Sequence, residues 1–180
     1  MSSTGIGKIY IKACALQGRD FRNMKGFVLR TAVTAAAAAA LFIFVIGIYL
    51  CTANSMYPRV LDGDLLIVSR ISGISEGDVI VFSRGGRHMC SRVAAVPGER
   101  ISVSGSGTVT VNGMAVSEEV FYPTGTGDAD YPVELGEGEY FVLNDYRTDL
   151  GTDSRSSSVG VVTAREIEGK IIFLVRRRGF

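Results

Sequence analysis

The longest hydrophobic stretch of the chain begins at residue 31. From residue 31 to residue 58 the sequence contains no Asp, Glu, Lys or Arg. Its first 20 residues would form a helix about 30 Å long, close to the hydrocarbon thickness of a bilayer. A helix that is apolar on all sides rarely belongs to a soluble protein. The pattern therefore predicts a transmembrane helix over residues 31–50.

Beyond residue 60, helical periodicity gives way to short runs rich in Val and Ile, bounded by glycine-containing turns. Such runs are typical of β-strands. They predict strands over residues 64–70, 78–83, 89–96, 100–103, 108–111, 140–143 and 170–175. The sequence Ser-Gly-Ser-Gly at 104–107 separates two of these runs and indicates a hairpin. Residues 51–180 are thus expected to form a mainly β, antiparallel domain, either barrel-like or multi-sheet.

Charge is distributed unevenly around the hydrophobic stretch. Residues 1–30 carry six basic residues and one acid, whereas residues 59–180 carry 13 basic and 17 acidic residues. Positive charge before a span favours a cytoplasmic N-terminus. This predicts a single-pass protein of the cytoplasmic membrane, with residues 1–30 inside, 51–180 outside and the lipid bilayer as a partner. Nothing in the charge pattern indicates a nucleic-acid-binding face.

Two other interpretations of the N-terminal region stay open. A cleaved secretory signal is one, although the apolar run exceeds the usual length of about 7–15 residues. A lipoprotein modified at Cys51 is the other, although the bulky Leu50 precedes it. The three cysteines, Cys14, Cys51 and Cys90, are expected to be free thiols, with Cys90 in the core. Their odd number and the single histidine argue against a disulfide framework or a metal site, and no cofactor is expected.

A series of short motifs follows the hydrophobic stretch in a fixed order. They are Ser55-Met56-Tyr57-Pro58, Gly63-Asp64, Gly77-Asp78-Val79-Ile80-Val81-Phe82, Ser91-Arg92-Val93, Pro97-Gly98-Glu99, Val111-Asn112-Gly113, Asn144-Asp145-Tyr146-Arg147, Asp153-Ser154-Arg155 and Gly169-Lys170. This set resembles the type I signal peptidase family (peptidase family S26) over about residues 30–175. The family's own pattern runs S-M-x-P-T, G-D, G-D-(I/V)-(I/V)-V-F, K-R-V, P-G-D, V-N-G, G-D-N-R-D-N-S-x-D-S-R and G-K.

The resemblance implies a serine endopeptidase whose nucleophile is activated by a neutral lysine. It places the nucleophile at Ser55 and oxyanion support at Ala53 and Asn54, where only backbone donors remain at Ala53. The lysine position is occupied by Ser91, whose hydroxyl cannot accept a proton near neutral pH. The family's lysine-orienting serine is also missing, because Leu150 and Gly151 stand in its place.

The resemblance assigns structural support of the active site to six further residues: Arg92, Asp145, Arg147, Asp153, Ser154 and Arg155. Arg92 and Asp145 are expected within about 4 Å of each other. Strand alternation puts His88 on the face opposite residue 91, which favours a solvated or structural role for this histidine.

Two functions are compatible with these residues. The first is a working membrane endopeptidase that cleaves signal peptides from exported precursors and uses another base, such as His88, Lys170 or a partner's side chain. The second is a catalytically impaired homologue that binds exported precursors. It is similar to signal-peptidase-like proteins that accompany pilin and sortase genes, and would act on pilins as a pilus-assembly chaperone.

Overall fold

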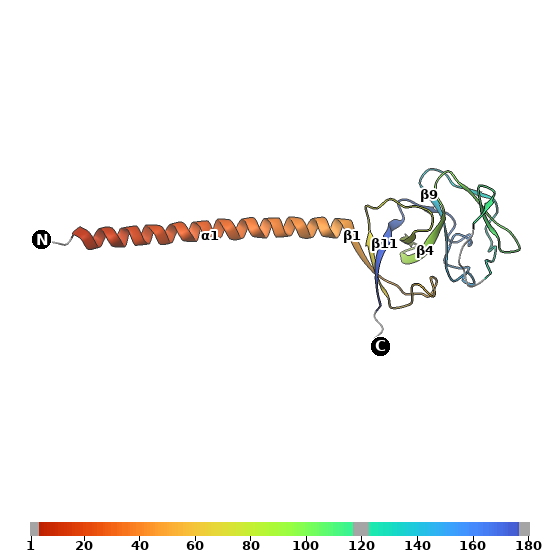
Figure 1. Ribbon diagram of the computed structural model, residues 1–180, viewed down its shortest axis with the longest axis horizontal. Helices are drawn as coiled ribbons and strands as arrows, with labels where there is room; N and C mark the ends of the chain where they lie inside the picture. The colour runs from red at the N-terminus through yellow and green to blue at the C-terminus, as the bar shows by residue number, and fades with distance from the viewer. Residues whose placement is uncertain (1–3, 117–122, 177–180) are drawn as a thin grey trace. The chain divides into compact units, whose positions relative to one another are not determined.

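The computed structural model describes residues 4–116 and 123–176, with side chains from residue 24 onward. The chain divides into two compact units, Met1–Phe44 and Val45–Phe180. The first unit is helical and the second consists of β-strands and loops (Figure 1). The expectation of a mainly β domain after an N-terminal apolar helix is confirmed.

A single helix, α1, runs over Thr4–Val45. Within it, Met24–Val45 is long and apolar enough to cross a membrane, and none of this segment is buried. Six consecutive alanines at 35–40 favour the helix, because alanine has the highest helix propensity. Bilayer contact would give these exposed apolar side chains the burial that the folded chain does not provide.

The helix ends five residues earlier than the sequence predicted. Ile46–Leu50 forms strand β1, which pairs antiparallel with β2 (Leu65–Ser69) from Ile46 opposite Ser69 to Leu50 opposite Leu65. β-Branched and aromatic residues suit a strand as well as a membrane helix. Pairing with β2 decides between them, and it fixes the chain at residue 51 against the β domain.

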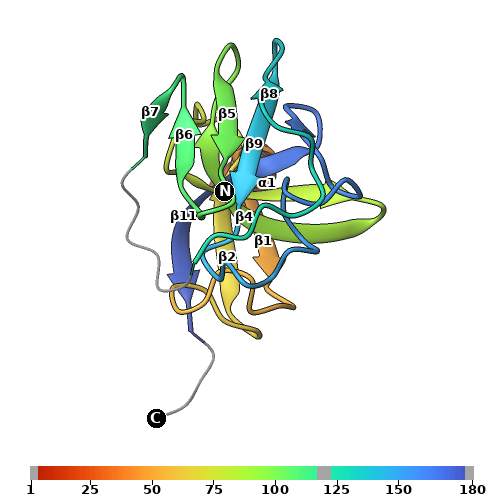
Figure 2. The same ribbon diagram turned by 90° about the vertical axis from the view of Figure 1, so that its right-hand side faces the viewer.

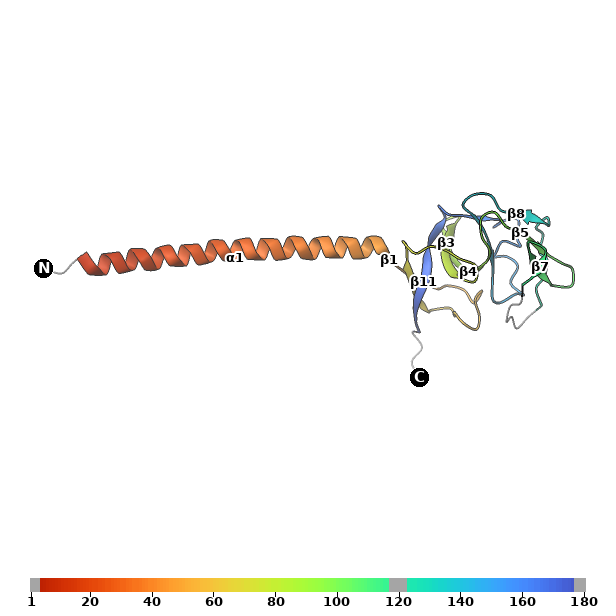
Figure 3. The ribbon, with the colours of Figure 1, turned by 45° about the horizontal axis from the view of Figure 1, so that its top comes forward.

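Seven strands form the larger sheet, in the order β1-β2-β11-β3-β4-β9-β10, and all its pairings are antiparallel. Figure 3 shows β3, β4 and β11 within this sheet. The remaining bounds are β3 Val79–Arg84, β4 Arg87–Ala95, β9 Glu139–Leu143, β10 Val162–Thr163 and β11 Ile167–Val175. A register shift occurs in β11 between Ile167 and Gly169, where it pairs with β3.

Four strands form the smaller sheet, in the order β7-β6-β5-β8 (Figure 2). They are β5 Arg100–Val103, β6 Val109–Val111, β7 Met114–Ala115 and β8 Val133–Glu134. The hairpin expected around residues 104–107 joins β5 to β6. Within the described residues the two sheets stay open and no closed barrel is found, so the multi-sheet alternative holds.

Three buried apolar clusters make up the core of the β domain. One of them joins the chain after β1 to β2, β3 and β4, through residues such as Cys51, Met56, Val81 and Cys90. This cluster lies directly beneath the segment that carries Ser55 and therefore fixes the position of the candidate nucleophile.

Candidate active site

Ser55 lies in the turn between β1 and β2. Its side chain is only 5% exposed, and its hydroxyl donates a hydrogen bond to the carbonyl of Cys90 in β4 at 3.3 Å. The carbonyl of Ser55 accepts a hydrogen bond from the backbone N–H of Tyr146 at 2.9 Å. Contacts with β4 on one side and with the segment after β9 on the other therefore hold this serine in place.

The turn itself is closed by short-range hydrogen bonds. The backbone N–H of Cys51 donates to the carbonyl of Asp64 at 2.8 Å, and that of Gly63 donates to the carbonyl of Cys51 at 2.9 Å. The side-chain oxygen of Asn54 accepts from the N–H of Asp62 at 2.9 Å. Asn54 therefore stabilises the turn through its side chain, which is a structural contribution to the geometry at Ser55.

A cavity of about 470 Å³ opens beside Ser55. It is lined by residues of β1 and the following turn, by one residue each of β2 and β3, by β4, and by Thr152: Tyr49, Leu50, Cys51, Thr52, Ala53, Ser55, Leu66, Val81, Arg87, His88, Met89, Cys90 and Thr152. Of the four positions that the sequence assigned to the nucleophile, the oxyanion support and the base, Ser55 and Ala53 line the cavity, whereas Asn54 and Ser91 do not. The lining is mostly apolar, so the cavity suits apolar side chains of a peptide.

Ser91 is fully buried at one end of a chain of polar side chains. Its hydroxyl donates to the side-chain oxygen of Asn144 at 2.7 Å, and the amide of Asn144 donates to the hydroxyl of Thr152 at 2.7 Å. Thr152 donates in turn to a carboxylate oxygen of Asp149 at 2.8 Å. Because Thr152 also lines the cavity, this chain connects the Ser91 position with the space around Ser55.

Sequence reasoning missed Asn144 and Thr152 as members of the site. Thr152 stands one residue after the position where the family keeps its orienting serine, and it offers a hydroxyl that the sequence comparison did not credit. A hydroxyl-bearing residue directly before Asp153 was the available signal. Its contact with Asn144 follows only from the fold of the loop after β9.

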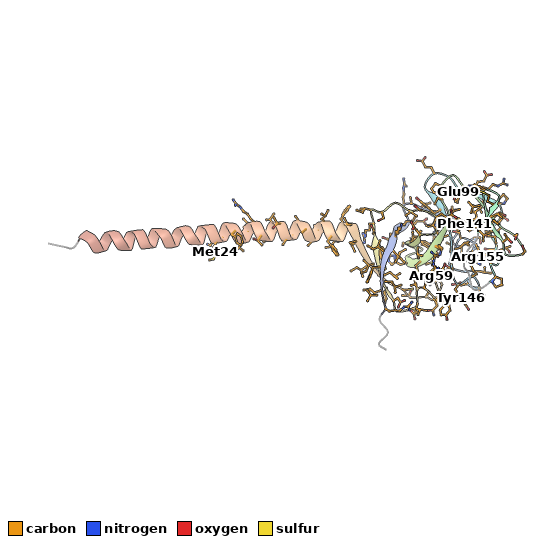
Figure 4. The ribbon with its side chains drawn as sticks, in the orientation of Figure 1. Met24, Arg59, Glu99, Phe141, Tyr146 and Arg155 are labelled. Atoms are coloured by element: carbon orange, nitrogen blue, oxygen red, sulfur yellow. The ribbon has the colours of Figure 1, made fainter. Side chains whose placement is uncertain are left out.

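Two ion pairs brace the strands behind the cavity. Arg92 and Asp145 make a two-point contact, at 2.8 Å and 2.6 Å, so the expected approach within about 4 Å is present. Asp153 and Arg155 pair at 2.6 Å, with both side chains fully buried. Figure 4 shows Arg155 within the body of the β domain.

The other two expected support residues are also buried in this region. Ser154 joins the loop to β9, because its hydroxyl accepts from the N–H of Val142 at 2.9 Å and its own N–H donates back to the carbonyl of Val142. Arg147 is 1% exposed, and its carbonyl accepts from Arg155 at 2.7 Å. These bonds fix the loop that carries Thr152 against the sheet.

Known signal peptidases share sequence with this chain over most of its length. The profile of the signal peptidase family, peptidase S26, matches residues 24–176. The chain belongs to the signal peptidase family. Signal peptidase I of Bacillus amyloliquefaciens is 30% identical over 161 residues, which cover 79% of this chain and 81% of that protein. Signal peptidase I T of Bacillus subtilis has the same identity and coverage.

A crystal structure of a signal peptidase I from Enterococcus faecalis is also similar, with a TM-score of 0.46 and 27% identity. The match covers 56% of this chain and 98% of that one. By family, this chain is a serine peptidase.

No lysine lines the cavity among the described residues of this chain. Lys170, one of the bases that the sequence left open, pairs with Asp78 at 2.8 Å. Its amine is therefore held by the carboxylate of Asp78, and Lys170 is not one of the residues that line the cavity. Lys170 therefore fits a structural role between β11 and the chain before β3.

His88 lies nearer to the site than strand alternation suggested. Four consecutive residues of β4, Arg87 to Cys90, line the cavity, so His88 contributes to the lining although alternation places it opposite residue 91. Its imidazole is half exposed, with Nδ1 4.0 Å from a carboxylate oxygen of Glu168 and the ring centroid 5.0 Å from that of Tyr49. Burial, together with a 2.9 Å hydrogen bond donated to Glu168, raises the pKa of Tyr49.

Proposed function

We propose that this protein is a membrane-anchored serine endopeptidase that removes signal peptides from exported precursors, with Ser55 as its nucleophile. One observation carries the proposal: in a chain of the signal peptidase family, the hydroxyl of Ser55 lies at the wall of an apolar cavity, held by the carbonyl of Cys90. A hydroxyl positioned beside a peptide-sized cavity is the arrangement that acyl transfer requires.

The substrate would bind as an extended segment beside the turn that contains Ser55. Main-chain hydrogen bonds would hold it as an added strand, and the cavity would receive its small side chains. Ala53 contributes no hydroxyl to this wall, so backbone N–H groups would stabilise the oxyanion in the transition state. Cleavage specificity would then depend on the depth of the cavity more than on charge.

The proposed active site lacks the usual general base. Ser91 supplies no amine, and its hydroxyl is already bonded to Asn144 at 2.7 Å. General-base catalysis typically contributes about 10²–10⁴ in rate, so a serine peptidase without it would be slow. His88 is the cavity-lining imidazole and the candidate that remains for accepting a proton.

In this proposal the membrane anchor places the active site next to its substrates. The apolar part of α1 that begins at residue 31 would enter the bilayer with the basic residues before it in the cytoplasm, and the β domain would act outside. Precursors that themselves cross the same membrane would then present their cleavage sites to Ser55.

A second function is favoured by the occupant of the base position. With Ser91 there and no lysine among the described cavity residues, the protein would bind exported precursors, pilins included, without cleaving them efficiently. In this alternative it acts as a pilus-assembly chaperone.

Cleavage of an exported precursor by the full chain in liposomes separates these functions. We expect slow cleavage that disappears in Ser55→Ala. Ser91→Lys should raise the rate by about 10²-fold or more, because it returns an amine to the end of the Asn144–Thr152 chain. Ser91→Met is the matched control, since it has nearly the length of lysine without the amine, and it should give no gain.

Cleavage that persists in Ser55→Ala would remove Ser55 as nucleophile. Precursor binding by an unmodified protein that does not cleave, with cleavage gained in Ser91→Lys, would support the chaperone function.

A further inference from the structure

Two cysteines lie together in the wall of the cavity beside Ser55. Cys51 follows β1 and Cys90 lies in β4, and both line the cavity. They belong to the same buried apolar cluster, at 5% and 6% exposure, and each is a free thiol. The two segments that carry them approach closely, because the rings of Tyr49 and His88, each two residues earlier in the chain, have centroids 5.0 Å apart. The thiol of Cys51 donates a hydrogen bond to the carbonyl of Ala53 at 3.0 Å. Residues 39 positions apart in sequence therefore place two thiols in one buried cluster at the wall of a solvent-connected cavity.

A single buried cysteine ordinarily serves only to pack the core, since a free cysteine behaves as a small hydrophobic residue. The pair differs from that case in two ways. The two thiols belong to one buried cluster, and they face a cavity of about 470 Å³ instead of a closed core. A small reagent can therefore reach them. The peptidase chemistry proposed for Ser55 uses neither thiol.

We propose that Cys51 and Cys90 form a reversible disulfide by exchange with a low-molecular-weight disulfide, and that the oxidised protein binds and cleaves its precursor less well. The second half of this proposal rests on the proposed function; the first half does not. A small disulfide is the appropriate oxidant, because thiols that are 5% and 6% exposed inside a cavity are shielded from the reactive site of another folded protein.

The exchange proceeds in two steps that conserve atoms and electrons. The thiolate of Cys51 attacks one sulfur of the small disulfide, whose S–S bond breaks and releases one thiolate, leaving a mixed disulfide on Cys51. Cys90 then loses its proton to water and attacks the Cys51 sulfur, which releases the second thiolate. The two cysteines are oxidised by two electrons, and the small disulfide is reduced to two thiols.

The surroundings of the two thiols differ in a way that decides which cysteine reacts first. The neighbouring Cys90 thiol lowers the pKa of the Cys51 thiol to about 7, and the neighbouring Cys51 thiol, together with burial, raises the pKa of Cys90. Cys51 is therefore the attacking thiolate and Cys90 the resolving thiol. Because the thiolate form of Cys51 increases as pH rises through about 7, the rate of exchange should increase over the same interval.

The disulfide would act on the site through Cys90. The carbonyl of Cys90 accepts the hydrogen bond from the Ser55 hydroxyl, so drawing Cys90 towards Cys51 disturbs the acceptor that positions the nucleophile. It also brings two walls of the cavity closer together, which removes space from a bound side chain. A change of about one methylene in such a pocket alters discrimination by about 10- to 200-fold.

The test uses the full chain in detergent with Cys14→Ser, so that only the cavity pair remains. The reduced protein is incubated with 2-hydroxyethyl disulfide across a range of pH, and its intact mass and free thiols are measured. We expect loss of the mass of two hydrogen atoms and of both thiols, faster above pH 7 and reversed by dithiothreitol. In the same background, Cys51→Ser should stay unmodified far longer, and Cys90→Ser should stop at the mixed disulfide.

Thiols that stay free, or a protein that carries only mixed disulfides while both cysteines are present, would overturn the disulfide. Precursor binding and cleavage are then compared for reduced and oxidised protein, with Cys51→Ser as the control that oxidation should not affect. A disulfide that forms without lowering binding or cleavage overturns the effect on the site. If the reduced protein neither binds nor cleaves, the proposed function fails, while the mass measurement still decides whether the pair is redox-active.

Discussion

The charged groups of the β domain differ widely in their surroundings, and the Asp153–Arg155 pair is the most enclosed. Both side chains are 0% exposed, and Arg155 also donates to the carbonyls of Arg147 and Asp149 at 2.7 Å and 2.8 Å. Asp153 accepts from the backbone N–H of Asn144 at 2.9 Å. A buried charge without its partner is costly, so this pair ties the loop that carries Thr152 to the end of β9.

Replacing Asp153 with asparagine should therefore destabilise the protein strongly. The change keeps the shape of the side chain but leaves the guanidinium of Arg155 buried without a counter-charge, a loss of about 3–5 kcal/mol. Thermal unfolding of the full chain in detergent measures the effect. Glu134→Gln is the matched control, because Glu134 and Arg100 lie 3.8 Å apart with exposed side chains and should contribute little. Equal shifts in the two variants would contradict the assignment.

Strand β11 shows how one glycine permits a close approach between elements. Gly169 adopts a φ of +154°, and a Cβ at this position would lie 2.6 Å from the backbone oxygen of Ser69 in β2. The register of β11 against β3 shifts at this residue. The Gly-Lys motif found in the sequence therefore marks a packing requirement at Gly169, beside a lysine that pairs with Asp78.

Gly169→Ala should push β11 away from β2. Overpacking against backbone typically costs about 1–3 kcal/mol, so we expect Gly169→Ala to lower the free energy of unfolding by that much more than Gly63→Ala does. Gly63 is the control because its φ is also positive, at +86°, but nothing lies within 4 Å of an added Cβ. Urea unfolding of both variants provides the comparison. An equal cost in the two would mean that the approach to Ser69 does not constrain the sheet.

At the scale of the whole molecule, the chain combines a long helix with a β domain that has its own core. The two units differ in how their apolar side chains are buried. The β domain contains three buried apolar clusters, whereas the segment Met24–Val45 has none of its residues buried within the chain. Six basic residues lie in the 30 residues before the predicted span. Together these properties predict insertion with the N-terminus in the cytoplasm.

Thiol labelling in intact cells tests this orientation. A membrane-impermeant maleimide should react with Gly105→Cys in a background without the native cysteines, because residue 105 lies in the exposed β5–β6 turn with open space around it. A protein in which Cys14 is the single cysteine is the matched control and should react only after the membrane is permeabilised. Labelling of Cys14 in intact cells would reverse the proposed orientation.

The sequence by itself determined which kinds of secondary structure this protein contains and to which family it belongs. Apolar length predicted a helix, short runs rich in Val and Ile predicted most strands, and ordered motifs indicated the signal peptidase family. The resemblance to that family also predicted that Arg92 and Asp145 pair. Hydrophobic patterns and family motifs are local features of the chain. Both can therefore be recognised from the order of the residues alone.

Only the tertiary structure decided where the helix ends and what surrounds Ser55. Hydropathy does not distinguish a strand from a helix over residues 46–50, and the pairing with β2 settled it. The buried cluster that holds Cys51 and Cys90, and the Ser91–Asn144–Thr152 chain, bring together residues distant in sequence. Which of these side chains meet depends on the register of β4 and on the path of the loop after β9, and neither is encoded in a local pattern.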